Sequence, residues 1–338
     1  MSEDSEMVSI IILNYNGERF IRRLLATLCD QSYKNFEVVF VDNASTDCSM
    51  SVVRDILEKE PYQRLNFKRI QCATNLGFCG GNNLGSQCAV GDYIVFLNND
   101  TYLSSTWLQE LVSVISCHKQ IGACQSRIVN ASTDDVETDG FNLDIGGYSQ
   151  TVVFDGEEGA VVGKTFYVSG ASMILRRSVF INCGGFDKSL FFGDYDLCWR
   201  LRLCGHSVAT ALESRCYHYG SSTIKATVPS TELAYHAYRE MLRVHLKNWG
   251  GGDLVKRMLQ LLSFITISSI HLSVTRRSHL FILSLFRSLL WNLRNIGDTL
   301  NARRRIQANR CVYDGDIARN ILPYSATICK RERVLVSV

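Results

Sequence analysis

Runs of mostly apolar residues recur along the first hundred residues of the chain. The clearest cover residues 8–13, 36–41 and 93–97, and a weaker run covers residues 65–71. Runs without strict apolar and polar alternation are typical of strands buried on both faces of a parallel sheet. The pattern therefore predicts four inner strands in this half of the protein.

Helical patterns separate these strands. Apolar residues at helical spacing follow the first run at positions 20, 24, 25 and 28, and the second at positions 52, 53, 56 and 57. Gly80, Gly81 and Asn82 mark the expected start of a third helix. Strand and helix alternation of this kind predicts right-handed βαβ units, hence an α/β fold with a Rossmann-like, mostly parallel sheet flanked by helices.

Polar residues follow each predicted strand where it ends. In chain order they are Asn14, Tyr15 and Asn16; Asp42, Asn43 and Ser45; Asn75 and Gly77; and Asn98, Asn99 and Asp100. The carboxyl ends of parallel strands share one edge of the sheet, which is where open α/β sheets bind ligands. We therefore expect a common site at this edge.

The middle of the chain continues the α/β pattern less regularly. It predicts a helix over residues 106–117, strands over 123–129, 166–175 and 206–212, and glycine-rich loops with a hairpin over 136–162. Asp194 and Asp196 open a further predicted helix that runs to about Cys204, and residues 216–220 read as a loop.

The character of the chain changes after residue 229. We predict a catalytic domain over residues 1–229 and a basic amphipathic helical region over 230–338. Residues 1–237 hold 19 Lys and Arg against 27 Asp and Glu, whereas residues 238–338 hold 17 against 6. Polar residues interrupt the apolar stretches over 259–274 and 281–293, which argues against a membrane span. These stretches fit helices that lie on an anionic bilayer, or helices that pack on the body or in a dimer.

Cysteine usage and the first residues bear on the compartment. The 13 cysteines are scattered without a CxxC pair, and the first seven residues are acidic and polar, unlike a secretory signal. The scattered cysteines favour buried thiols in a reducing compartment, so we expect a cytoplasmic protein. If the basic helical region lies on the bilayer, the protein would be peripheral on the inner face of the cell membrane.

Asp100 is the most informative polar residue of the predicted edge. A carboxylate flanked by amides suits a hard divalent cation such as Mg²⁺ or Mn²⁺ and, through it, a diphosphate. A polar turn that ends a strand is the simpler interpretation of the same three residues.

Seven segments occur in an order and spacing that resemble the family 2 glycosyltransferases, and most closely their rhamnosyltransferase-like branch. They are VSIIILNYN, FVDNASTD, NLGFCGGNN, FLNNDT, YVSGASMILRR, GGFD and FFGDYDLCWRLRLCG. The resemblance covers about residues 7–250 and implies the GT-A fold and a nucleoside diphosphate-sugar donor. It also implies which residues bind the nucleotide sugar. They are Asn14, Tyr15, Asn16, Asp42, Asn43, Ser45, Asn75, Gly77, Asn82, Asn98 and Asn99.

The resemblance also assigns the chemistry. Asp100 takes the place of the last acid in the family's Asp-x-Asp motif, with Asn98 instead of the first, and His218 resembles a late histidine that completes the metal site. Asp194 matches the second acid of a Glu-Asp pair and would be the general base of an inverting reaction; Gly193 stands where the first acid is expected. Asp196 is interpreted as a helix cap or structural acid, and Arg200 and Arg202 either reach the diphosphate or form salt bridges with the body.

Three functions remain open from the sequence. The first is a glycosyltransferase that uses a UDP-, dTDP- or GDP-sugar and a glycan or lipid-linked hydroxyl acceptor, with no nucleic-acid partner. The second is a nucleotidyltransferase, although NYNGERF after the first strand lacks a basic, glycine-rich phosphate loop. The third is a non-catalytic nucleotide-binding homologue.

Overall fold

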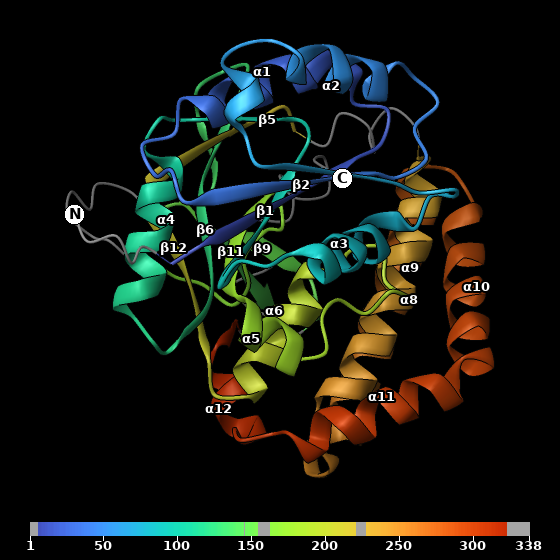
Figure 1. Ribbon diagram of the computed structural model, residues 1–338. Helices are drawn as coiled ribbons and strands as arrows, with labels where there is room; N and C mark the ends of the chain where they lie inside the picture. The colour runs from blue at the N-terminus through green and yellow to red at the C-terminus, as the bar shows by residue number, and fades with distance from the viewer. Residues whose placement is uncertain (1–5, 145, 155–162, 221–227, 323–338) are drawn as a thin grey trace.

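A curled, mostly parallel sheet runs through the centre of the protein, with helices on both faces (Figure 1). The computed structural model describes residues 6–144, 146–154, 163–220 and 228–322. The first half contains β1 (Val8–Asn14), α1 (Glu18–Cys29), β2 (Phe36–Asp42), α2 (Ser49–Leu57), the 3-10 helix η1 (Tyr62–Arg64), β3 (Phe67–Gln71), α3 (Gly77–Cys88) and β4 (Tyr93–Asn98). The α/β fold class predicted from the sequence is confirmed.

The middle of the chain completes the sheet. It contains β5 (Thr101–Leu103), α4 (Trp107–Cys117), β6 (Ile121–Asn130), β7 (Val136–Thr138), β8 (Phe141–Asp144), β9 (Ser149–Thr151), β10 (Gly163–Lys164), β11 (Ser172–Arg176), α5 (Arg177–Asn182), α6 (Asp194–Leu203) and β12 (Ser207–His218). The strand order is β10-β12-β6-β11-β4-β1-β2-β3, and β11 is antiparallel to both β4 and β6. A small second sheet has the order β13-β8-β9, where β13 is the short C-terminal strand Ile321–Leu322.

Successive residues of the inner strands face opposite sides of the sheet, and both sides are covered. Ile10 and Ile12 pack with α1, α2 and α4, whereas Ile11 packs with α3, α6 and the C-terminal helix α8 (Ser230–Asn248). All three isoleucines are completely buried. Two-sided burial explains why these strands are apolar throughout instead of alternating.

Two predicted boundaries are wrong. β11 starts at Ser172 rather than at residue 166, because the preceding chain carries Gly170, whose N–H donates to Asp194 instead of to a neighbouring strand. β12 continues to His218, so most of the predicted loop over 216–220 is strand, held by pairing with β5 and β6. The short strands and hairpin expected over 136–162 are present as β7 to β9, although residues 145 and 155–162 lie outside the described residues.

The C-terminal region is helical and packs on the sheet layer. It contains α8 (Ser230–Asn248), α9 (Gly251–Thr275), α10 (Leu280–Arg294), α11 (Ile296–Ala308), α12 (Asp314–Arg319) and the short β13 (Ile321–Leu322). Val244 and Trp249 join the same apolar core as α3 and α6, and Ile321 pairs with Leu143 of β8. Within the described residues, α9 alone is long and apolar enough to cross a membrane by length and composition.

Candidate active site

The ends of β1, β2 and β4 lie side by side and join their polar side chains. Asn14 is opposite Asp42 in the parallel register, and Leu13 is opposite Asn98. The buried Asn14 amide donates to Asp42 Oδ1 at 3.1 Å and to Ser45 Oγ at 3.1 Å, and its Oδ1 accepts from Asn99 Nδ2 at 2.8 Å. The structure therefore brings together the polar strand ends that the sequence singled out.

Asn16 and Tyr15 form the outer wall of this group. Asn16 has a left-handed backbone, with φ of 51°, which an asparagine tolerates better than most residues. Its N–H donates to Ser45 Oγ at 3.0 Å, and its Oδ1 accepts from the Thr46 N–H at 2.8 Å. Tyr15 is 37% exposed, so its ring is available for stacking.

A second group of amides joins β2 to the start of α3. Asn43 Nδ2 donates to Asn75 Oδ1 at 2.9 Å, and the same oxygen accepts from the N–H of Gly77 at 2.8 Å. Gly77 begins α3 with a φ of +68°, a conformation that favours glycine. The free N–H groups of a helix start favour an anion, and here they lie beside the strand ends.

Asn82 is not at the start of this helix, contrary to the sequence-based expectation. α3 begins five residues earlier, at Gly77, because Gly80 and Gly81 continue the helix instead of preceding it. Asn82 is buried, and its Nδ2 donates to the carbonyl oxygen of Phe78 at 3.1 Å. This position belongs to the inside of the helix rather than to its anion-binding end.

Gly17 lies against the Asn14–Asn99 hydrogen bond. A Cβ at this residue would meet Asn99 Nδ2 at 2.0 Å and Asn14 Oδ1 at 2.4 Å. Gly17→Ala is expected to break this bond and to weaken binding of the nucleoside diphosphate expected at this edge, with UDP as the probe, by about tenfold, because one or two hydrogen bonds of the edge are lost. Isothermal titration calorimetry measures the change. Gly297→Ala, where a Cβ has open space, is the matched control, and equal UDP affinity in the two variants would contradict the prediction.

Asp100 lies at the turn after β4 and faces His218 at the end of β12. His218 Nε2 is 3.3 Å from Asp100 Oδ1, and its Nδ1 is 3.3 Å from Glu137 Oε2. Both Asp100 and His218 are buried. Burial lowers the pKa of His218, but hydrogen bonding and the charges of Asp100 and Glu137 outweigh it and raise the pKa to about 9. The pairing of Asp100 with His218 expected from the resemblance is therefore present in the geometry.

Asp100 and His218 are the candidate ligands of a divalent cation. Among the described residues, no group of three or more His, Cys, Asp or Glu side chains forms a metal cluster. His218 Nε2 is nevertheless buried and lies 3.3 Å from the Asp100 carboxylate, so both groups face one point. One carboxylate and one imidazole nitrogen, oriented by a second carboxylate at Nδ1, fit a cation that takes its other ligands from a diphosphate and water.

Asp194 begins α6 and faces the chain just before β11. Its Oδ2 accepts from the N–H of Gly170 at 3.0 Å, while its buried Oδ1 has no hydrogen-bond partner. Burial raises the pKa of Asp194 to about 6, and the hydrogen bond from Gly170 opposes part of that increase. A half-buried carboxylate with one fixed and one unpartnered oxygen is suited to accept a proton.

Backbone contacts bring Asp194 to the same edge as Asp100. The N–H of Asn98 donates to the carbonyl oxygen of Ala171 at 3.0 Å, one residue after Gly170. The base candidate is thus attached to the loop next to the end of β4. Gly193 fits here because a Cβ would meet Cys79 Sγ at 2.4 Å, so the larger acid expected from the resemblance has no room.

Asp196 and Arg200 are structural, as predicted. Asp196 is completely buried and accepts from Arg200 Nε at 2.9 Å, and Lys247 Nζ lies 3.0 Å from its Oδ2. Arg202 differs from its expected salt bridge, since it donates to the carbonyl oxygens of Thr165 and Phe166. These contacts fix α6 and thereby the position of Asp194.

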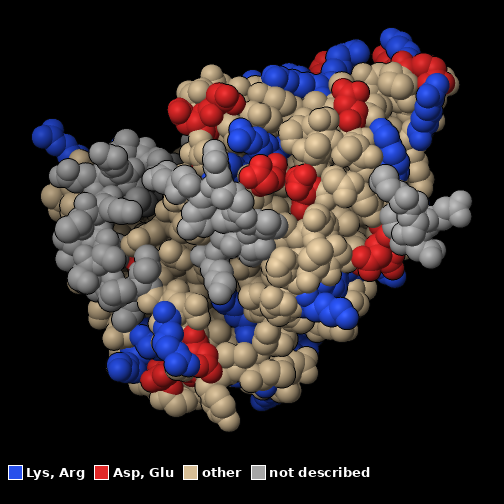
Figure 2. Space-filling model, turned by 90° about the vertical axis from the view of Figure 1, so that its left-hand side faces the viewer, with Lys and Arg blue, Asp and Glu red and all other residues tan. Residues whose placement is uncertain are grey.

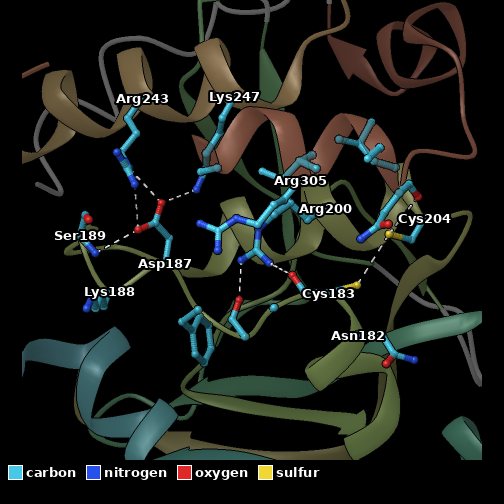
Figure 3. A pocket seen from close by; sticks show the side chains of 18 of the residues that line it. Asn182, Cys183, Asp187, Lys188, Ser189, Arg200, Cys204, Arg243, Lys247 and Arg305 are labelled. Carbon is cyan, nitrogen blue, oxygen red and sulfur yellow. Dashed lines mark hydrogen bonds and ion pairs between the residues drawn. The ribbon is translucent and has the colours of Figure 1, made fainter. Parts of the chain in front are cut away.

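A cavity of about 630 Å³ lies beside this ionic network. It is lined by the segment that follows α5 and by residues of α6, α8 and α11. Figure 3 shows Asp187 between Arg243 and Lys247, with Arg200 reaching toward the carbonyl of Cys183. The residues that line the cavity include none of the polar strand ends. The cavity is therefore separate from the candidate active site.

The structure adds residues that the sequence did not single out. Glu137 contacts His218, and Gly170 holds Asp194. An aromatic group also stands at the end of β12, where Tyr102 and Tyr217 stack at 4.6 Å and Arg23 Nη1 donates to Tyr219 Oη at 2.6 Å. The only sequence signal for this group was the presence of tyrosines on both sides of His218.

The comparisons with known proteins agree with this arrangement. The family model of glycosyl transferase family 2 matches residues 9–184, just over half of the chain. The chain belongs to this family. One relative of this glycosyltransferase is the amylovoran biosynthesis glycosyltransferase AmsB of Erwinia amylovora, 27% identical over 192 residues that cover 57% of this chain and 62% of the relative.

Another relative is the poly(ribitol-phosphate) beta-N-acetylglucosaminyltransferase TarS of Staphylococcus aureus. It is 34% identical over 113 residues, which are 32% of this chain and 19% of the relative. An uncharacterised glycosyltransferase of Haemophilus influenzae is 33% identical over 31% of this chain and 40% of its own length. The aligned segments thus span less than two thirds of these relatives.

Solved structures share the fold. TarS residues 1–349 of S. aureus in complex with UDP-GlcNAc align with a TM-score of 0.59 at 18% identity, covering 90% of this chain and 83% of that one. GalNAc-T7 with UDP, GalNAc and Mn²⁺ aligns with a TM-score of 0.60 at 16% identity, covering 73% of this chain and 49% of that one. This glycosyltransferase has the GT-A fold.

Proposed function

We propose that this glycosyltransferase moves a sugar from a nucleoside diphosphate donor to a hydroxyl acceptor with inversion at the anomeric carbon. The observation that carries the proposal is the carboxylate of Asp194, with one oxygen held by Gly170 and the other without a partner. Its attachment to the end of β4 brings a base candidate to the edge that carries Asp100.

Asp194 would accept the proton of the acceptor hydroxyl as that oxygen attacks the anomeric carbon. The bond to the diphosphate breaks in the same displacement, so a single base on the side opposite the leaving group inverts the configuration. A pKa of about 6 leaves Asp194 ionised at neutral pH and more basic than an exposed carboxylate.

The donor would bind along the ends of β1, β2 and β4. Asp42, Asn43 and Ser45 are positioned for the nucleoside, with Tyr15 as a stacking surface, and the start of α3 at Gly77 would face the phosphates. Asp100 and His218 would hold a Mg²⁺ or Mn²⁺ ion, which neutralises charge on the departing diphosphate when bound. Structures of the same fold solved with UDP-GlcNAc, or with GDP-Man and Mn²⁺, support a UDP- or GDP-sugar, and a dTDP-sugar stays a prediction from the resemblance.

The acceptor would be a glycan or a lipid-linked saccharide at the inner face of the cell membrane. The printed activities of the relatives, amylovoran biosynthesis and transfer to poly(ribitol-phosphate), support a cell-surface polymer as the product class. Rhamnosyl transfer, from the resemblance to the rhamnosyltransferase-like branch, stays a prediction about the donor sugar.

Incubation with a panel of nucleotide sugars and Mn²⁺ tests the proposal by release of nucleoside diphosphate. Asp100→Asn is expected to raise the Mn²⁺ concentration for half-maximal rate by on the order of 10–100-fold, because the ion loses a charged ligand. Asp55→Asn, which changes an exposed acid on α2, is the control. Release of pyrophosphate from a nucleoside triphosphate would instead identify a nucleotidyltransferase, and UDP binding without turnover would identify a non-catalytic homologue.

A further inference from the structure

The two helices α9 and α10 have a one-sided charge composition. Apart from Asp253 in the first turn of α9, the two helices carry no acidic residue: residues 254–297 contain six Lys and Arg and no Asp or Glu. The face on the other side of the molecule differs, because Figure 2 shows acidic and basic side chains mixed across it. Soluble surfaces usually intersperse both signs, so the composition of this hairpin needs a separate explanation.

Each helix of the hairpin also exposes a stripe of large apolar side chains. On α9 the stripe consists of Val255, Leu259, Ile267, Ile270 and Val274, which are 50–71% exposed. On α10 it consists of Leu283, Phe286, Leu290 and Leu293, which are 46–69% exposed. The spacing of three and four residues keeps each stripe on one helix face. Contiguous exposed apolar surface of this kind marks an interaction site.

The opposite faces of both helices are attached to the body. Leu261 and Ile265 of α9 and Leu285 of α10 pack in one cluster with α8. Phe264 contacts the ring of Tyr148 edge-on at 4.9 Å, and Tyr148 Oη donates to Ser268 Oγ at 2.8 Å. These contacts hold α9 alongside the catalytic body, so its exposed stripe faces outward and the helix does not stand free to cross a bilayer. Figure 1 shows α10 at the outer margin of the molecule, beside α8 and α9.

Basic side chains frame the two stripes. Arg276, Arg277 and His279 form the exposed turn between the helices, and Lys256 and Arg294 are exposed at the other ends. Among the described residues, none of these five has an acidic partner within ion-pair distance. Arg287, in the middle of α10, is different because Nη1 is 2.8 Å from Glu232 Oε2.

We infer that the outward face of α9 and α10 docks on the surface of an anionic lipid bilayer. The apolar stripes would enter the headgroup region, and the basic turn and helix ends would contact lipid phosphates. A symmetric dimer through this face would bring the same basic residues of two copies together, and the only acidic side chain on the two helices is Asp253 in the first turn of α9. The inference deepens the proposed membrane-held acceptor but does not depend on glycosyl transfer.

Vesicle flotation of the full chain tests this inference without any donor sugar. We expect binding to vesicles of phosphatidylglycerol and phosphatidylcholine, much weaker binding to phosphatidylcholine alone, and loss of binding as salt is raised. Arg276→Gln/Arg277→Gln should lower the partition coefficient by on the order of tenfold to thirtyfold, because two charges near the surface are removed. Phe286→Ser/Leu293→Ser should lower it by at least about tenfold through lost apolar burial.

Matched variants on other faces are the controls. Arg54→Gln/Lys59→Gln removes two exposed charges at α2, and Val90→Ser/Ile181→Ser removes two exposed apolar side chains away from the hairpin. Binding of the hairpin variants at the level of these controls would overturn the inference. So would a dimer in sedimentation equilibrium that Phe286→Ser/Leu293→Ser separates into monomers while vesicle binding stays unchanged. Failure of the donor-panel assay with intact flotation would count against the proposed reaction alone.

Discussion

Replacing Asp194 by Asn is expected to lower the rate of glycosyl transfer by on the order of 10²–10⁴-fold, because the amide cannot accept the acceptor proton. The asparagine oxygen can still accept the N–H of Gly170, so the loop before β11 keeps its position. Affinity for UDP should be unchanged, since the nucleotide residues lie on β1, β2 and the start of α3. Single-turnover kinetics and UDP titration measure the two quantities separately.

The same substitution should leave the fold at least as stable at neutral pH. The pKa of Asp194 is raised to about 6 in the folded protein, mainly by burial, from the 3.8 of an ordinary aspartate. The protonated form therefore stabilises the fold below pH 4, and this contribution is lost as pH rises through about 6. Thermal unfolding at pH 8 should show Asp194→Asn more stable than the natural protein by on the order of 1–2 kcal/mol, with a smaller difference at pH 4.

The pH dependence of kcat gives an independent check. The rate of the natural protein should fall about tenfold for each pH unit below 6, as Asp194 becomes protonated. A limb with the same apparent pKa in Asp194→Asn would show that another group is the base. A variant with unchanged turnover would remove Asp194 from the mechanism altogether.

The sheet and its polar edge were predictable because the pattern is local. A strand buried on both faces must be apolar over its length, and its first polar residues must mark where it emerges. Asn14, Asp42 and Asn98 therefore mark the edge from local pattern alone, and the parallel register sets Asn14 opposite Asp42 and Asn98 opposite Leu13, one residue before Asn14. The connection between Asp100 and His218 depended on the family resemblance, because the two residues lie 118 positions apart in the sequence and no helix or strand periodicity relates them.

The errors arise where long-range pairing decides the local structure. Residues 216–218 look like a loop in isolation, but pairing with β5 and β6 on two sides makes them strand. Gly80 and Gly81 look like a helix start, yet a Cβ on Gly81 would meet Leu13 Cδ1 at 2.3 Å, so these glycines allow α3 to lie close to β1. Glycine in a helix that packs tightly on a strand cannot be distinguished by pattern from glycine before a helix.

The division of the chain into two domains at residue 229 stays a proposal. Ion pairs join residues on the two sides of this boundary. Lys247 of α8 is buried between Asp187 and Asp196, with Nζ at 2.5 Å and 3.0 Å from their carboxylates. Arg243, one turn earlier, also donates to Asp187 at 2.9 Å. These pairs connect the C-terminal region to α6, the helix that begins with Asp194. The position of the base candidate thus depends on residues from both sides of the boundary.

Replacing Lys247 by Met is expected to destabilise the fold by about 3–5 kcal/mol, because it removes the charge that compensates two buried carboxylates. Burial alone would raise the pKa of Asp187, but Lys247 and Arg243 hold it well below the ordinary range. Urea unfolding measures the loss.

Lys188→Met, which changes the exposed neighbour of Asp187, is the matched control and should shift stability by no more than about 0.5 kcal/mol. Lys247→Met/Asp187→Asn should cost less than the sum of its two single changes, because the double variant leaves one fewer unpaired carboxylate. Equal stability of the Lys247 and Lys188 variants would mean that the buried network does not hold α8 to the catalytic body.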